Sequence, residues 1–344
     1  DRAISRGNGF KTRRCFMIPP CHLLSLSTHV PDAVLTNDDI AQLVDTSDDW
    51  IVSRTGIRQR HTLPEADNAS DLGLAAARKA LADAGTEPEE LTHVLAATCT
   101  PDALSPSVAC LVAGRLGAGN AMAFDISAAC SGFLYGLSLC QALLAQSPTA
   151  KILFVCTEAL TRRLNWADRS TCILFGDAAT ACLVASAPDK KVALVEDVLC
   201  MSDGTQSELI VVGGGSRCRY KKGDPVDEDF FVAMRGRETY KYAVRNMSQA
   251  CTEILSRNHL TAAQVDLLVP HQANLRIIEA VGSRLDLTGE KVFINVDKYG
   301  NTSSASIPLA LAEARAAGRI AEGGRVLITA FGAGLTWGAS LLRF

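Results

Sequence analysis

Residues 123–144 constrain the fold of this chain more than any other stretch. A short apolar run ends in small residues around Cys130, and a long pattern of helical spacing begins directly afterwards. Small residues leave the sulfur uncovered and let a ligand approach the backbone closely. The free N–H groups at the start of such a helix would lower the pKa of the thiol. The pattern favours a nucleophile at a strand-to-helix turn, although a small buried cysteine gives the same pattern.

The same stretch includes residues 126–145, which carry no charge and are about as long as a membrane-spanning helix, near 20 residues. It also contains Ser, Gly, Cys and Gln141, and Asp125 stands directly before it. A helix that is buried on all sides inside a large α/β protein has this composition too. We therefore interpret the stretch as a core helix and expect no membrane association.

Composition limits the remaining function classes. The chain has 344 residues, of which 48% are hydrophobic, and a formal net charge of −3, which does not favour nucleic acid as a partner. Its 12 cysteines form no C-x-x-C pair and have no finger-like spacing to histidines, so no metal site is expected. They lie singly in apolar runs, as thiols do in soluble proteins of a reducing compartment.

Residues 1–20 are expected to form a leader without regular structure. Residues 1–17 contain four arginines and a lysine against one acid, with no apolar periodicity. This composition is typical of an organelle transit peptide, which would place the protein in a plastid stroma. A cloning artefact or a disordered tail gives the same pattern, and the bacterial cytoplasm is then the expected compartment.

Helices and strands alternate along the rest of the chain. Periodicity predicts helices at 40–44, 70–84, 108–116, 132–144, 239–256 and 306–317. Strands are expected at 23–30, 94–98, 121–126, 151–157, 178–184, 265–269, 291–296, 325–331 and 339–342. Residues 45–61 alone would most often be a surface loop.

Part of this order occurs twice. Cys99 and His271 each follow a strand, while Cys130 and Asn301 each lie in a turn of small residues before a helix. Cys130 follows Cys99 by 31 residues, and Asn301 follows His271 by 30. We therefore expect two equivalent halves, 21–190 and 191–344, with parallel sheets between helix layers about a pseudo-twofold axis. Equivalent turns would then meet, bringing Cys130, His271 and Asn301 together.

The motifs at these turns resemble those of β-ketoacyl-acyl-carrier-protein synthase III. The similar segments are Asp125–Leu137, 270–277 (Pro-His-Gln-Ala-Asn-Leu-Arg-Ile), 300–308 (Gly-Asn-Thr-Ser-Ser-Ala-Ser-Ile-Pro), Trp50–Arg60, 175–179 and 334–338. The resemblance extends from about Leu23 to Phe344. It implies an α/β, thiolase-like fold of five layers, αβαβα, built from two pseudo-repeated halves. It also implies a decarboxylating Claisen condensation of acetyl-CoA, or another short acyl-CoA, with malonyl-acyl-carrier protein, which initiates type II fatty acid synthesis.

The resemblance also assigns catalytic roles. Cys130 would carry the acyl group as a thioester. His271 and Asn301 would polarise the malonyl thioester, so that loss of carbon dioxide leaves a stabilised enolate. The N–H groups of Cys130 and Ala333 would form the oxyanion hole, and Phe331 an apolar wall near the malonyl carboxylate. Taken singly, His271 and Phe331 are more often core residues, and Asn301 a turn or cap residue.

Further residues are implied to bind the substrates. Trp50 and Arg169 would sandwich the adenine of CoA with Arg54 nearby, and Asn274 would line the pantetheine channel. A tryptophan near several basic groups also suits an anionic, ring-bearing ligand on chemical grounds. A local basic patch would dock the acidic carrier protein; its members are Lys241, Arg276 and Arg284.

Three more expectations follow from the family. The protein would be a homodimer, and it would need no cofactor, because acyl-CoA is a substrate. Ser105 occupies a position where related enzymes can carry a bulky residue that reaches the partner's acyl pocket, so primers longer than acetyl would be admitted. The sequence departs from the family at His22–Ser27, where glycines are usual, and at 213–229, a polar stretch expected to be a long surface loop.

Other functions stay open at this point. A starter synthase of quinolone or polyketide type would share the fold and the three catalytic residues. Elongating synthases need a second histidine where Asn301 stands, which excludes them. A Cys-His thioesterase or a non-catalytic acyl-CoA-binding module would also use parts of this pattern, although the uncovered Cys130 argues against the module.

Overall fold

The structure is a computed structural model, and it describes residues 19–187, 191–218 and 223–344. Nearly all of the predicted leader therefore lies outside the described residues. The predicted surface loop at 213–229 is described only in part, as mostly exposed chain between two short paired strands, β10 (Ile210–Val212) and β11 (Val232–Met234).

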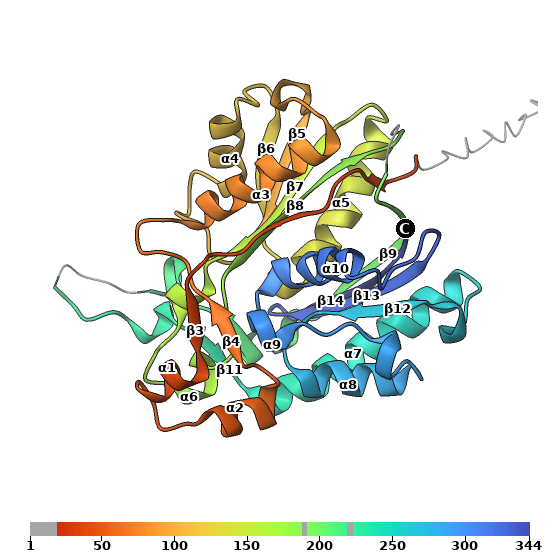
Figure 1. Ribbon diagram of the computed structural model, residues 1–344. Coiled ribbons are helices and arrows are strands. Elements are labelled where there is room, and N and C mark those ends of the chain that lie inside the picture. The colour runs from red at the N-terminus through yellow and green to blue at the C-terminus, as the bar shows by residue number, and fades with distance from the viewer. Residues whose placement is uncertain (1–18, 188–190, 219–222) are drawn as a thin grey trace, which may run out of the picture.

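Helices and sheet strands alternate in five layers (Figure 1). One outer layer contains α3 (Ala69–Ala84) and α4 (Val108–Leu116), which cover β5 (His93–Ala97), β6 (Met122–Ile126), β7 (Ile152–Glu158) and β8 (Ala178–Ala185). The middle layer contains α5 (Gly132–Gln146) and α10 (Ser306–Ala316). Below it lie β9 (Ala193–Ser202), β12 (Leu267–Pro270), β13 (Arg325–Gly332) and β14 (Thr336–Arg343), covered by α7 (Gly236–Arg257) and α8 (Leu275–Arg284). The predicted αβαβα architecture is confirmed.

The sheet layers are connected and mixed, which corrects the expectation of parallel sheets. Strand β1 (His22–Leu23) pairs with β8 on one side and β9 on the other, so one strand order runs β12-β13-β14-β9-β1-β8-β7-β5-β6. Among the strands that the structure describes in this sheet, the parallel pairs are β5–β6, β5–β7 and β12–β13, and the others are antiparallel. The reason is local, because a tight turn such as that from β13 to β14 can join only antiparallel strands.

Two predicted strands differ from the structure. Residues 23–30 form two pieces, β1 and β2 (Ser27–His29). Residues 291–296 form no strand, and only Val292 bridges Leu268 before the short helix α9 (Val296–Tyr299). The buried carboxamide of Gln272 explains the second case, because it donates to the carbonyl of Phe293 and accepts from the N–H of Asn295, where a strand would need ladder partners.

The segment expected to be a loop at 45–61 is ordered instead. It contains α2 (Asp48–Thr55) and β4 (Gln59–His61), which pairs with β3 (Val34–Thr36). Helix α1 (Asn37–Ala41) precedes it, with Thr36 and Asp39 forming a reciprocal cap, and α6 (Arg169–Cys172) packs at the same end of the molecule (Figure 1). Caps and packing, rather than apolar periodicity, specify these short elements.

Helix α5 is a core helix, as predicted. It lies between the two sheet layers, with Phe133 stacked on Phe154 of β7 at 5.8 Å between ring centroids. None of the helices in the described segments is both long and apolar enough to cross a bilayer. Gly136 lets α5 approach β7, because a Cβ on this residue would lie 2.0 Å from Cζ of Phe154.

A pair of glycine substitutions tests this packing. Gly136→Ala should lower the free energy of unfolding by about 1–3 kcal/mol, because the buried Phe154 ring must move. Gly114→Ala is the matched control in α4, where a Cβ meets nothing within 4 Å, and it should stabilise by about 0.5–1 kcal/mol. Urea unfolding of both variants gives the two values, and equal changes would contradict the close approach.

Candidate active site

The Cys130 turn leads from β6 into α5 through a 3-10 turn, Ala129–Ser131. Ala129 has φ of +46°, an uncommon conformation for a residue with a side chain. The turn is covered by the hairpin between β13 and β14, since a Cβ on Gly332 would lie 2.8 Å from the N atom of Cys130. The Oγ1 of Thr336 donates to the carbonyl of Ala128 at 3.0 Å and fixes this contact. A side chain at residue 332 would therefore displace the nucleophile.

The hairpin also places two of the predicted supporting residues. Phe331, at the end of β13, is buried, and Ala333 lies in the turn that packs on Cys130. A second hydroxyl reinforces the contact, because Oγ of Ser131 donates to the carbonyl of Thr336 at 3.1 Å. The backbone of Ala333 is therefore close to the nucleophile, as an oxyanion hole requires.

Asn301 is held in a defined orientation. It is buried, and its Oδ1 accepts the N–H of Ser303 at 2.9 Å. Its backbone pairs with the segment around Phe175, donating to Leu174 at 2.8 Å and accepting from Gly176 at 3.1 Å. Because Oδ1 is occupied by a donor, the Nδ2 group of the amide is left to donate to a ligand.

His271 is buried directly after β12. Its Nδ1 lies 2.5 Å from Oγ of Ser306, and the same Oγ accepts the N–H of Gln272 at 3.4 Å. Ser306 can donate its hydroxyl proton to Nδ1, and the imidazole proton then lies on Nε2. Burial lowers the pKa of His271 to about 3, so the ring is neutral at physiological pH.

The segment 301–306 brings these groups together. A Cβ on Gly132, at the start of α5, would lie 3.0 Å from Cβ of Ser304, so the two turns are in direct contact. Ser303 lies close enough to the Cys130 thiol to lower its pKa, while Ser306, three residues on, holds the His271 ring. The segment that carries Asn301 thus contacts both of the other predicted catalytic residues.

The residue correspondence expected between the halves is wrong in detail. The 3-10 turn before α10 is Ser303–Ala305, and Ser303 has φ of +50°, matching Ala129 at +46°. Local conformation therefore aligns Cys130 with Ser304 rather than with Asn301. The nearly equal sequence separations do not reflect equivalent positions in the two halves, because the strand expected before Asn301 is replaced by α9.

The thiol of Cys130 does not have the low pKa that the helix N-terminus suggested. Burial is the largest cause and raises the pKa of Cys130 to about 12, and the charge of Glu158 acts in the same direction. Ser303 lowers the pKa of Cys130, but by less than burial and Glu158 together raise it. In the free protein, both the thiol of Cys130 and the imidazole of His271 are therefore neutral.

Glu158 is a buried residue of this site that the sequence analysis missed. It ends β7, and its carboxylate accepts from the N–H of Cys99 at 3.0 Å, Oγ1 of Thr100 at 3.2 Å and Oγ of Ser304 at 2.7 Å. Burial raises the pKa of Glu158, and these hydrogen bonds lower it in part. It thereby joins the turn after β5 to the turn before α10. An acid at the end of a fully apolar strand was the available signal.

Three of the predicted CoA-binding residues form a cluster at the surface. The guanidinium carbons of Arg54 and Arg169 lie 4.3 and 4.6 Å from the ring centroid of Trp50. Arg169 also donates to the carbonyl of Asp45 at 2.6 Å. We call Trp50, Arg54 and Arg169 the nucleotide clamp. A base inserted between two stacked planes needs about 7 Å, twice the usual contact distance, so Arg169 must move for an adenine to enter.

Asn274 and Arg276 connect α8 to the clamp. Asn274 caps α8 by accepting the N–H of Arg276 at 2.9 Å, and it donates to the carbonyl of Arg54 at 3.1 Å. The guanidinium of Arg276 donates to the carbonyl of Ser53 at 2.8 Å. Both side chains therefore have structural partners in α2, next to the position expected for the pantetheine arm.

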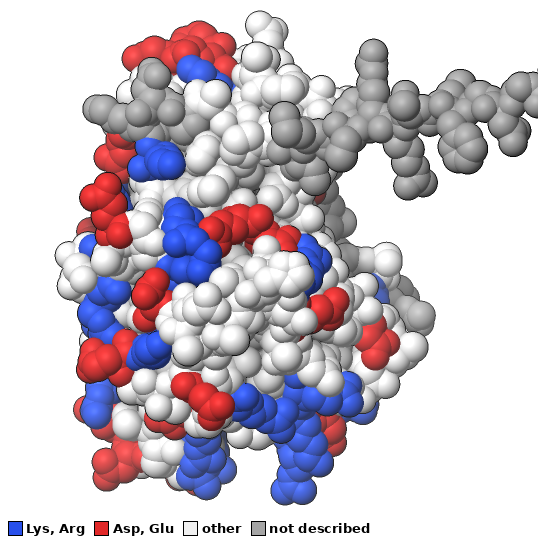
Figure 2. All heavy atoms as spheres, turned by 90° about the vertical axis from the view of Figure 1, so that its right-hand side faces the viewer, with Lys and Arg blue, Asp and Glu red and all other residues white. Residues whose placement is uncertain are grey.

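The other basic candidates lie on the outer helix layer. Lys241 is exposed on α7, and Arg284 is exposed on α8 beside a groove of about 630 Å³ that Arg245 and Arg257 also line. Figure 2 shows Lys and Arg side chains gathered along the lower edge of the molecule, at the level of α7 and α8 in Figure 1, with acidic groups among them.

Two further observations bear on the predictions. Ser105 lies in an exposed loop beside Leu104, which is 86% exposed.

Among the described residues, no group of three or more His, Cys, Asp or Glu side chains could hold a metal ion.

Comparison with known proteins gives consistent matches over most of the chain. Residues 124–204 match the family model for 3-oxoacyl-[acyl-carrier-protein] synthase III, and residues 255–344 match the model for its C-terminal part. The chain is 56% identical to β-ketoacyl-[acyl-carrier-protein] synthase III of Nitratidesulfovibrio vulgaris strain Miyazaki F, over 94% of this chain and 98% of that one.

Solved structures agree. The 3-oxoacyl-[acyl-carrier-protein] synthase III of Aquifex aeolicus has a TM-score of 0.86 and 41% identity, covering 94% of this chain and 100% of its own. The β-ketoacyl-[acyl-carrier-protein] synthase III of Thermus thermophilus has a TM-score of 0.86 and 42% identity, covering 94% and 99%.

The neutral state of His271 predicts a specific pH dependence. Unfolding exposes the imidazole, which then takes up a proton below about pH 6.5, while the native ring does so only near pH 3. Lowering the pH from 7.5 to 5.5 should therefore cost the wild type about 1.4 kcal/mol more unfolding free energy than His271→Asn. Urea unfolding at both pH values measures this, with exposed His259→Asn as the control that should follow the wild type. Parallel losses in wild type and His271→Asn would show that the native ring is protonated in this range.

Proposed function

The chain belongs to the β-ketoacyl-acyl-carrier-protein synthase III family, and from that premise we propose how its residues divide the reaction. It is a condensing acyltransferase that initiates fatty acid synthesis. In the proposed reaction a short acyl-CoA, such as acetyl-CoA, acylates Cys130, and malonyl-acyl-carrier protein supplies the carbon nucleophile. One observation supports these roles above all. Segment 301–306 holds His271 through Ser306 and contacts the Cys130 turn through Ser304.

The first proposed step is acyl transfer. The sulfur of Cys130 attacks the thioester carbon of acyl-CoA, and the N–H groups of Cys130 and Ala333 stabilise the oxyanion. Collapse of the tetrahedral intermediate breaks the bond to the CoA sulfur. Because burial keeps Cys130 protonated beforehand, its proton must leave as the new C–S bond forms, and it ends on the departing CoA thiol.

The second proposed step is decarboxylation and condensation. The Nε2–H of His271 and the Nδ2 of Asn301 donate to the carbonyl oxygen of the malonyl thioester. When the bond to the carboxylate breaks, its electron pair enters the enolate that these donors stabilise, with Phe331 as an apolar neighbour. The carboxylate leaves as carbon dioxide, and the enolate carbon attacks the acyl-cysteine. The bond to the Cys130 sulfur breaks, and the released thiolate takes up a proton from solvent to restore the neutral thiol. A neutral His271 suits this role, because the step needs a donor and not a base.

Different residues are proposed to bind the two substrates. We propose that the nucleotide clamp binds the adenine of CoA after Arg169 moves aside, with Asn274 along the pantetheine arm. Lys241, Arg276 and Arg284 offer positive charge to an acidic carrier protein. No cofactor is needed in this scheme, because acyl-CoA is a substrate whose thioester activates the acyl group, and loss of carbon dioxide drives the condensation.

We also propose a homodimer and a reducing compartment. Strand β6 ends the strand order, and Met122 on it is 57% exposed, so a second copy can pair along this edge. The cysteines that the structure describes are free thiols, which fits a compartment such as the bacterial cytoplasm or a plastid stroma. A starter synthase of polyketide type would use the same site, and the carrier protein and primer tested distinguish the two.

Substitutions of the three catalytic residues separate the steps. Cys130→Ser should abolish acyl transfer, because a hydroxyl does not replace the thiol as nucleophile. His271→Ala and Asn301→Ala should still acquire an acyl group on Cys130 but decarboxylate malonyl-acyl-carrier protein about 10²–10³-fold more slowly. Intact-protein mass spectrometry reports the acyl group, and labelled carbon dioxide reports decarboxylation. Normal condensation by either alanine variant would refute this division of labour.

The small side chain of Ser105 predicts the range of primers. Octanoyl-CoA should be used at a rate comparable to acetyl-CoA, and Ser105→Phe should reduce the longer primer selectively. Turnover measured with a panel of acyl-CoAs checks this. A wide margin in favour of acetyl-CoA in the wild type would show that another residue limits the pocket.

A further inference from the structure

Arg60 is a fully buried arginine that the reaction scheme does not use. It lies on β4, and its guanidinium donates to the carbonyl of Leu35 at 3.2 Å, to Oδ1 of Asn37 at 2.9 Å and to the carbonyl of Ile173 at 2.6 Å. Its Nε has no partner among the described residues, and no described acidic side chain forms an ion pair with it. Burial lowers its pKa to about 10. Burying a charged guanidinium without an ion-pair partner costs folding free energy, so a function for Arg60 is worth seeking in its contacts.

The guanidinium reaches both parts of the nucleotide clamp. On one side, the amide of Asn37 continues the network by donating to Asp48 at 2.7 Å, in the first turn of α2, which carries Trp50 and Arg54. On the other side, Ile173 directly follows α6, which carries Arg169. Arg60 therefore connects two helices that are distant in sequence and close in space (Figure 1).

The aliphatic stem of Arg60 lies beside the backbone next to Asn301. A Cβ on Gly176 would lie 2.9 Å from Cβ of Arg60, and a Cβ on Gly300 would lie 3.4 Å from it. These glycines flank the backbone bridge between Phe175 and Asn301. Arg60 thus contacts Ile173, directly after the helix that carries Arg169, and the backbone next to Asn301, and it is linked to α2 through Asn37 and Asp48.

We propose that Arg60 is a positioning residue that fixes the nucleotide clamp relative to Asn301, so that CoA binding at one end aligns its thioester at the other. This rests on the proposed function, in which the clamp binds the nucleotide of CoA. A ligand held at both ends gains reactivity only if the distance between the two sites is fixed. The acceptors lie in two distant parts of the chain, at Leu35 and Asn37 and at Ile173, and one rigid fork that reaches both provides that restraint.

A purely structural role makes a different prediction. If Arg60 only stabilised the fold, its loss would affect every acyl donor equally. If it fixes the clamp, only donors that reach the clamp are affected. S-acetylpantetheine has the same thioester and arm as acetyl-CoA but no nucleotide, so it distinguishes the two roles.

The test compares kcat/KM for acyl transfer with acetyl-CoA and with S-acetylpantetheine. In Arg60→Met, which keeps an apolar stem, the ratio of the two values should fall about tenfold or more, with S-acetylpantetheine changed by less than about twofold. Asp48→Asn weakens the same network without altering the buried cation, and it should lower the ratio by a smaller factor. This second variant keeps the proposal testable if Arg60→Met folds poorly.

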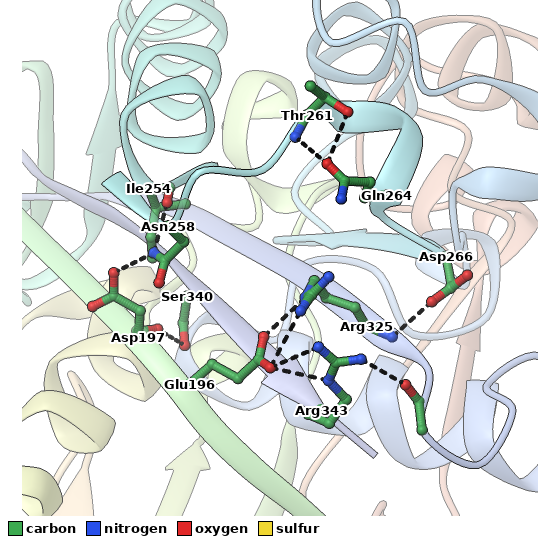
Figure 3. Close-up of polar contacts among 11 residues, drawn as sticks. Glu196, Asp197, Ile254, Asn258, Thr261, Gln264, Asp266, Arg325, Ser340 and Arg343 are labelled. Carbon is green, nitrogen blue, oxygen red and sulfur yellow. Dashed lines mark hydrogen bonds and ion pairs between the residues drawn. The ribbon is translucent and has the colours of Figure 1, made fainter. Parts of the chain in front are cut away.

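Arg325→Met is the matched control. Arg325 is another largely buried arginine, with 17% of its side chain exposed, and it pairs with Glu196 at 2.9 Å beside Arg343 (Figure 3). These residues lie on β9, β13 and β14, and none of the three contacts the clamp. Its substitution should lower thermal stability and leave the donor ratio at the wild-type value.

The outcomes separate the inference from the function on which it rests. Trp50→Ala should lower the donor ratio, and if it does not, the nucleotide clamp itself is wrong and the inference fails with it. If Trp50→Ala lowers the ratio while Arg60→Met and Asp48→Asn leave it unchanged, the clamp stands and the role of Arg60 is refuted. A lower ratio in all three variants, with Arg325→Met unchanged, supports the inference.

Discussion

Close contact between two turns of small residues is the constraint on which the rest of the structure depends. Gly132 at the start of α5 leaves no room for a Cβ between Ala97 and Ser304, so the turn before α5 packs directly on the turn before α10. The carboxylate of Glu158 accepts a hydrogen bond from Oγ of Ser304 at 2.7 Å and so holds this turn in place. Each turn begins with a strained non-glycine residue, which persists only because the surrounding packing fixes it.

Burial at this contact determines the protonation states of the site. It raises the pKa of Cys130 to about 12 and lowers that of His271 to about 3, so both groups are neutral before substrate arrives. In the proposed reaction, a neutral His271 with its proton on Nε2 acts as a hydrogen-bond donor during decarboxylation. In the same proposal, the Cys130 thiol loses its proton during the attack on the CoA thioester.

Elements with strong periodicity were predicted well, and short elements were not. Helix 70–84 and helix 108–116 agree with α3 and α4 within one residue. Residues 45–61 were expected to be a loop but contain α2 and β4, which depend on the cap at Ser47 and on the buried guanidinium of Arg60. The predicted strand at 291–296 failed because the side chain of Gln272 takes the hydrogen bonds that a neighbouring strand would need.

Apolar spacing and small-residue turns in the sequence predicted the alternating helices and strands and the segments that carry Cys130, His271 and Asn301, because these are local signals, and the family resemblance implied the five layers. Only the tertiary structure decided what surrounds them: the carboxylate of Glu158, the hydroxyls of Ser303 and Ser306, and the guanidinium of Arg60. These contacts join residues from distant parts of the chain, for example Glu158 with Ser304 and Arg60 with Ile173. The pKa of a buried group depends on its neighbours in space, which is why the lowered pKa expected for Cys130 from its position before a helix was wrong.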